Sequence, residues 1–149
     1  MSAKYKSFIL ISVLAVLILV VSIGAVAYPG ESVTGGGWII KGGEKANFGF
    51  NVKYQNNGKL QGNLEFEDRS TGQPVQYKAT DLSKLIVSKN KKFAGFTGKL
   101  EIDREGSYDF RVHVTDNGSP GTSDIFSIQV SNGYSASGVL GGGNIDIKK

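Results

Sequence analysis

Residues 46–66 read ANFGFNVKYQNNGKLQGNLEF, and this stretch decides the fold. Its first half alternates apolar residues with Asn, Gly and Lys, and the second half, residues 60–66, does the same. Alternation with period two places the apolar side chains on one face of a strand. The pair Asn57-Gly58 between the halves favours a tight turn, because both residue types tolerate positive φ. The stretch therefore predicts a β-hairpin, whose apolar face must be covered by further strands.

The rest of the chain continues this pattern. Apolar residues alternate or run briefly between turns rich in Gly, Asn and Pro, at residues 31–41, 75–79, 82–88, 94–102, 108–115, 126–130, 134–140 and 144–147. No helical period of 3.6 persists beyond the first 27 residues. This predicts an all-β fold, a single antiparallel sandwich or barrel of about 8–10 short strands, in one domain at residues 28–149. The run Gly35-Gly36-Gly37 predicts a bulge or a close approach of two backbones.

The first 27 residues have the pattern of a signal peptide helix. Lys4 and Lys6 precede an apolar run, and Ala25-Val26-Ala27 supplies the small residues that signal peptidase recognises. The alternative is a retained signal anchor, because residues 8–27 are long enough to span a bilayer. Either reading predicts a secreted or cell-surface domain, with membrane contact only through a retained anchor.

The charge balance and the absence of cysteine argue against some classes of function. The chain carries 17 basic and 13 acidic residues, and removal of residues 1–27 takes away Lys4 and Lys6, so the net charge falls from +4 to +2. This balance argues against a nucleic-acid partner, and the short lysine runs at residues 89–92 and 148–149 are typical of solvated turns and tails. The chain has no cysteine. An exported domain without disulfides must depend on a packed core, which suits a bacterial or archaeal surface.

An ordered series of motifs resembles the post-COAP domain, a β-rich module of exported bacterial and archaeal proteins. The matching residues are Val33-Thr34-Gly35-Gly36-Gly37-Trp38-Ile39, Ala46-Asn47-Phe48-Gly49-Phe50, Lys53-Tyr54, Gly62-Asn63-Leu64-Glu65-Phe66, Asp68, Thr71-Gly72, Tyr108-Asp109-Phe110, Val112, Val114, Asp116, Gly118, Pro120-Gly121, Asp124 and Gly142-Gly143-Asn144-Ile145. The resemblance implies a secreted or surface-attached module with no established reaction. Members often carry histidines where this chain has Arg69 and Gln76, so a metal or catalytic role of those histidines does not carry over.

Catalytic candidates are few. Glu65 and Glu67 lie two positions apart on one strand face, roughly 7 Å apart from the rise per residue. This separation is within the range of paired carboxylates in glycosidases, although two solvent-facing carboxylates would look the same. His113 is the only histidine, and a triad or zinc site needs more partners. We therefore expect no enzyme activity, with a small glycoside-type hydrolase as the remote alternative.

Binding candidates lie elsewhere in the chain. Trp38 and Tyr134 are aromatic residues that could contact a ligand, although a lone Trp more often packs within a protein. Asp116, Asn117 and Asp124 offer oxygen ligands for calcium, or alternatively caps for the backbone of a turn.

The sequence thus predicts a non-catalytic exported module for binding or adhesion, whose partner is a cell-surface protein or a glycan. The alternative is a structural subunit that assembles with itself by β-strand addition, because the edge strands of an open sheet have unpaired backbone groups. We expect no cofactor other than the calcium considered above.

Overall fold

The computed structural model describes residues 28–149, which contain nine strands and no helix. The strands are β1 Ser32–Lys41, β2 Glu44–Tyr54, β3 Leu60–Asp68, β4 Val75–Val87, β5 Phe93–Ile102, β6 Glu105–Thr115, β7 Ile125–Val130, β8 Ser135–Val139 and β9 Gly142–Lys148. They form one antiparallel sheet in the order β8-β7-β6-β5-β4-β3-β2-β1-β9. The predicted all-β class and strand number are confirmed. The signal peptide helix predicted for residues 1–27 lies outside the described residues.

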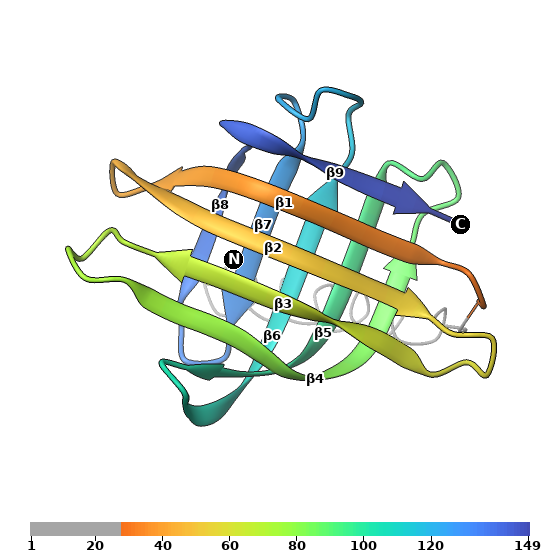
Figure 1. Cartoon of the computed structure of the whole chain (residues 1–149), viewed down its shortest axis with the longest axis horizontal. Helices are drawn as coiled ribbons and strands as arrows, with labels where there is room; N and C mark the ends of the chain where they lie inside the picture. The colour runs from red at the N-terminus through yellow and green to blue at the C-terminus, as the bar shows by residue number, and fades with distance from the viewer. Residues whose placement is uncertain (1–27) are drawn as a thin grey trace, which may run out of the picture.

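The sheet curls so that its two halves face each other. In Figure 1, β9, β1, β2 and β3 form the front layer, and β5 to β8 cross behind it. The long strand β4 joins the layers, and its pairing with β5 shifts register between Ala79 and Asp81 and again between Leu82 and Lys84. Such irregularities bend a strand and increase its twist. The separate segments predicted at residues 75–79 and 82–88 are therefore one bent strand.

The core fills the space between the layers. Phe66, Phe96 and Phe126 are at most 1% exposed. The rings of Phe48 on β2 and Phe126 on β7 stack with centroids 4.2 Å apart, across the two layers. Each large apolar side chain buried here contributes roughly 2–3 kcal/mol. This aromatic packing stabilises a domain that has no disulfide to do so.

The predicted hairpin is present, with a different turn. Gln55 NH donates to Lys59 O (2.8 Å), so the loop is longer than the two residues Asn57-Gly58. Only Gly58 has positive φ, at 80°, while the Asn57 side chain accepts from Lys59 NH at 3.0 Å. Asn57 thus stabilises the turn by its side chain, and the expectation of positive φ at both residues was wrong for Asn57.

The glycines of β1 permit close packing on both sides. A Cβ on Gly35 would lie 2.5 Å from Cζ of Phe50, and one on Gly37 would overlap the carbonyl of Gly142 on β9. β1 pairs with β2 and β9 without a register shift. The predicted close backbone approach is confirmed, and no bulge is present in β1.

The two edge strands, β8 and β9, follow each other in the chain through residues 140–141. Side chains occupy part of each free edge. Asp124 Oδ2 accepts from Ile145 NH on β9 (2.8 Å), and Lys41 Nζ donates to Ser135 O on β8 (2.9 Å). Among residues 28–149, no helix could cross a membrane.

Candidate functional site

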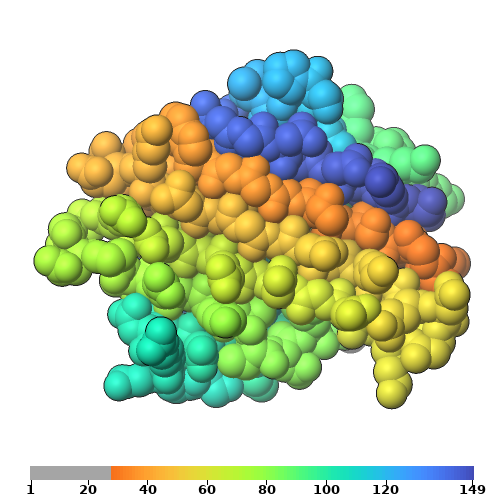
Figure 2. Space-filling model, viewed as in Figure 1, coloured from red at the N-terminus to blue at the C-terminus, as the bar shows by residue number. Residues whose placement is uncertain are grey.

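A polar surface covers the outward side of the front layer. The strand register aligns its residues in three cross-strand rows, which we call the amide face: Gly142-Trp38-Asn47-Glu67-Gln76, Asn144-Gly36-Gly49-Glu65-Lys78, and Asp146-Thr34-Asn51-Asn63. Alternation along each strand turns these side chains outward while their neighbours fill the core. Figure 2 shows these strands packed side by side as one broad surface. Of the fourteen residues of this face, five are amides and three are glycines.

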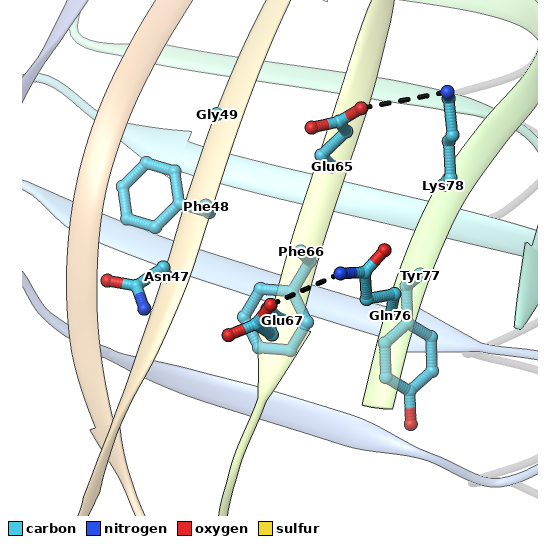
Figure 3. A pocket seen from close by; sticks show the side chains of 9 residues that line it. All are labelled: Asn47, Phe48, Gly49, Glu65, Phe66, Glu67, Gln76, Tyr77 and Lys78. Atoms are coloured by element: carbon cyan, nitrogen blue, oxygen red, sulfur yellow. Dashed lines mark hydrogen bonds and ion pairs between the residues drawn. The ribbon is translucent and has the colours of Figure 1, made fainter. Parts of the chain in front are cut away.

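The middle row is hollow, because Gly36 and Gly49 are direct partners on adjacent strands. A Cβ on Gly49 would meet nothing within 4 Å, and one on Gly36 would have its nearest neighbour at 3.8 Å. Next to Gly49 lies a shallow groove of about 380 Å³, lined by Asn47, Phe48, Gly49, Glu65, Phe66, Glu67, Gln76, Tyr77 and Lys78 (Figure 3). The groove is therefore open above a floor of backbone and rimmed by polar side chains.

Glu65 and Glu67 both line this groove, and cationic or amide groups engage both carboxylates. Glu67 accepts from Arg69 Nε at 2.6 Å. It also accepts from Gln76 Nε2 at 3.3 Å, while Glu65 lies 3.8 Å from Lys78 Nζ (Figure 3). The Glu65 side chain is 71% exposed. A glycosidase needs one carboxyl group held protonated, usually by burial away from cations. Both carboxylates instead lie on the outer side of the sheet, beside cationic or amide groups.

Trp38 lies at one end of the amide face, half-buried. Its indole packs against the backbone of Gly141 and Gly142, where an added Cβ would overlap the ring. Lys45 Nζ lies 4.3 Å from the ring centroid, within cation–π range. Trp38 therefore packs on the glycines. Lys45 lies over its ring, so a ligand could stack at that place only after Lys45 moves away.

Tyr134 lies on the core side of the sheet rather than on this face, in a polar cluster at the end of β3. Its hydroxyl donates to Asp68 Oδ2 (2.5 Å), and its ring stacks on Tyr77 with centroids 4.6 Å apart. Lys41 Nζ lies 5.5 Å from the centroid of the same ring. Tyr134 thus connects the turn before β8 to the opposite layer.

Burial and charge shift the pKa values of this cluster. Burial alone raises the pKa of Asp68, but hydrogen bonds from Tyr134 and Ser70, together with the charge of Lys41, outweigh it and lower the pKa. Burial and the neighbouring Asp68 raise the pKa of Tyr77 to about 12. The same two causes, with the hydrogen bond to Asp68, raise the pKa of Tyr134 above its ordinary value. At neutral pH the cluster contains a carboxylate and two protonated phenols.

The loop between β6 and β7 brings Asp116, Asn117 and Asp124 together: backbone NH groups bind oxygens of Asp116 and Asp124, and the Asn117 amide donates to Ser123 O. Asp124 is fully buried; its Oδ1 accepts from Asn117 NH at 2.7 Å and its Oδ2 from Ile145 NH at 2.8 Å. Asp116 Oδ1 accepts from Gly118 NH at 3.0 Å. This is the pattern of turn capping. Within residues 28–149, no three His, Cys, Asp or Glu side chains are grouped so that they could hold a metal ion.

The sequence alone does not predict the amide face, although it identifies some of the outward polar residues that form it. Asn47, Gly49 and Asn51 were identified only as the polar positions of a strand. The residues that complete the rows come from β9 and β4, whose pairing depends on the whole sheet.

Comparison of the chain with protein-family models, curated proteins and solved structures found no match.

Proposed function

We propose that this chain is an exported, non-catalytic surface module, built on a sandwich-like or barrel-like sheet of the post-COAP type, that binds an extended glycan along its amide face. The observation that carries the proposal is the pair Gly36-Gly49, set between two rows that contain four outward amides: Asn47, Gln76, Asn51 and Asn63. Amide side chains both donate and accept hydrogen bonds, so they match sugar hydroxyls in either role. The two glycines would let a sugar ring approach the backbone.

The rigidity of this surface supports the same function. Each amide is fixed at a register position of a continuous sheet, and short Asn side chains lose little freedom when they bind a ligand. The groove is shallow and open, which suits a chain lying across the strands better than a small molecule that must be enclosed. Trp38, at the edge of the face, adds apolar surface that can contact a sugar once Lys45 moves.

The two other function classes have weaker support. Hydrolysis by Glu65 and Glu67 would need one carboxyl group placed to give a proton to the substrate, whereas Glu67 already accepts hydrogen bonds from Arg69 and Gln76, and Glu65 lies beside Lys78. Self-assembly by strand addition would need free edges, and Asp124 and Lys41 already bind backbone groups at the two edges.

A glycan array followed by titration calorimetry tests the proposal. We expect Asn51→Ala to weaken binding about five- to tenfold, the effect of one or two lost hydrogen bonds. Gly49→Val should weaken it at least as much, because the added side chain fills the groove floor. Gln129→Ala, on the outer face of the other layer, is the matched control and should bind normally.

The same experiment separates the alternatives. Binding without cleavage, unchanged in Glu65→Gln, would support a binding module. Glycan cleavage that disappears in Glu65→Gln would instead establish a hydrolase. If neither Asn51→Ala nor Gly49→Val changes the affinity for a bound glycan, the amide face is not its binding site.

A further inference from the structure

Seven exposed lysines gather at the end of the domain where residue 28 enters, an arrangement that we call the lysine end. They come from the end of β2, the turn after it, the loop between β4 and β5, and the last two residues: Lys53, Lys59, Lys89, Lys91, Lys92, Lys148 and Lys149. In the sequence they form separate short runs. The fold brings these runs together.

Hydrogen bonds connect the segments that carry these lysines. Gly30 NH donates to Tyr54 O at 3.2 Å, and Tyr54 Oη donates to Leu85 O at 3.2 Å. Lys149 Nζ donates to Val87 O at 3.4 Å. Figures 1 and 2 show the start of β1, the turn between β2 and β3 and the C-terminal end of β9 at the same, right-hand end of the molecule.

Carboxylates near this end do not balance its charge. Glu31 is 3% exposed and lies 3.4 Å from Lys149, and Asp146 lies 3.4 Å from Lys148. The other five lysines make no ion pair among residues 28–149. At the far end of β5 and the start of β6 the charge is reversed, because Glu101, Asp103, Glu105 and Asp109 outnumber Lys99 and Arg104. The domain is electrically polarised along these strands.

We propose that the lysine end docks on an anionic lipid bilayer. Charge complementarity is the first argument, because lysines close to a membrane surface are attracted by anionic headgroups. The second is the chain outside the described structure: residues 8–27 are almost wholly apolar and end directly before Tyr28. Tyr28 and Phe93 are 52% and 53% exposed at this end, and aromatic residues are favoured at the membrane interface.

This inference is independent of the proposed glycan binding. The acidic far end would be repelled by the same surface, so docking orients the domain. Lys53 and Lys148 border the nearest row of the amide face, whereas the groove beside Gly49 lies farther along the strands, away from the lysine end. Figure 1 shows the strands of this face running away from that end. Docking and glycan binding can therefore fail separately.

Site-specific labels on the full chain test the docking. The chain has no cysteine, so a single dye can be attached to Asn56→Cys, in the turn between β2 and β3. Thr71→Cys, in the turn at the other end of β3, is the matched control, about 30 Å away by the rise per residue. Each labelled chain is reconstituted in nanodiscs of phosphatidylcholine, alone or with phosphatidylglycerol, containing a lipid with a nitroxide quencher on its headgroup.

We expect strong quenching at position 56 and weak quenching at position 71 in the anionic discs, with the difference reduced by high salt and in pure phosphatidylcholine. Replacing Lys59, Lys89 and Lys92 by Gln should weaken docking by roughly fivefold or more for each lysine. The same replacement at Lys78, Lys84 and Lys99 should have little effect. Equal quenching of the two labels, or quenching independent of anionic lipid, overturns the proposal and leaves an acidic protein or polymer as the partner of this end.

Discussion

Asp124 illustrates how one buried carboxylate can hold separate segments of a disulfide-free domain. Its two oxygens bind the backbone of the loop after β6 and of β9, and its own carbonyl accepts from Leu140 NH at 2.9 Å. An unsatisfied buried NH group costs about 1–3 kcal/mol.

We therefore predict that Asp124→Ala lowers the free energy of unfolding by about 3 kcal/mol, measured by urea denaturation. Ser123→Ala, whose side chain is exposed in the same loop, is the control and should change stability by less than about 0.5 kcal/mol. A small loss in Asp124→Ala would mean that water or a rearranged loop satisfies the two NH groups.

Tyr134 and Asp68 predict a pH dependence. The folded pKa of Asp68 lies below its ordinary value of 3.8, so its contribution to stability is present above that pH and is lost as the pH falls through the folded pKa. Tyr134→Phe removes one donor to the carboxylate and should cost about 1.5–3 kcal/mol at pH 7.

The cost of Tyr134→Phe should shrink as the pH of the unfolding measurement falls through the folded pKa of Asp68, because protonated Asp68 no longer needs a charge-assisted donor. Tyr108→Phe serves as control, since its hydroxyl makes no hydrogen bond within the described residues. A cost independent of pH would assign the effect to packing against Tyr77 instead.

At the scale of elements, two glycines on adjacent strands have opposite roles. Gly37 on β1 has φ of 152°, and a Cβ there would overlap the backbone of β9. Gly37→Ala should therefore lower the free energy of unfolding by at least about 2 kcal/mol. Gly49→Ala on β2 meets open space and should stay within about 0.5 kcal/mol of the original chain.

Thermal unfolding followed by circular dichroism measures both variants. If Gly49→Ala folds normally but weakens glycan binding, the groove floor is functional and separate from stability. If the two variants are equally stable, the close approach of β1 and β9 relaxes more readily than the backbone overlap indicates.

The elements show which parts of the fold a sequence can specify. Strict alternation predicts β2 and β3 almost to the residue, because period two follows directly from strand geometry. The β4 residues that pack on the core are Val75, Tyr77, Ala79, Leu82, Leu85 and Val87. Their spacing changes from two to three at the two register shifts, which breaks the alternation. The sequence pattern therefore predicts two separate segments where the chain forms one strand.

The candidate site was predictable only in part, for a related reason. Local pattern identified which residues of β2 and β3 point outward, but the alignment of Asn51 with Asn63 depends on the longer turn, which was not predicted. The pairing of Gly36 with Asn144 joins residues from the two ends of the domain, and no local signal encodes it. The bond between Tyr134 and Asp68 has the same long-range origin.

At the scale of the whole molecule, the curled sheet leaves two edges that could recruit another chain. Asp124 and Lys41 occupy backbone groups at those edges, which is one way that native sheets avoid edge-to-edge association. We predict that purified residues 28–149 stay monomeric over a wide range of concentration in size-exclusion chromatography with light scattering.

Removing the side chains of both Asp124 and Lys41 tests whether their bonds to the edge strands keep the chain monomeric. Because Lys41→Ala with Asp124→Ala frees Ser135 O on β8 and Ile145 NH on β9, the double variant should associate at concentrations where the original chain does not. Lys84→Ala with Asp81→Ala, which changes charge equally on β4, is the matched control.

Calcium and EDTA should leave the original chain unchanged, because backbone NH groups already bind both Asp124 oxygens. Polymers of the original chain would favour strand addition, and a calcium-dependent melting temperature would favour a cation at Asp116, Asn117 and Asp124.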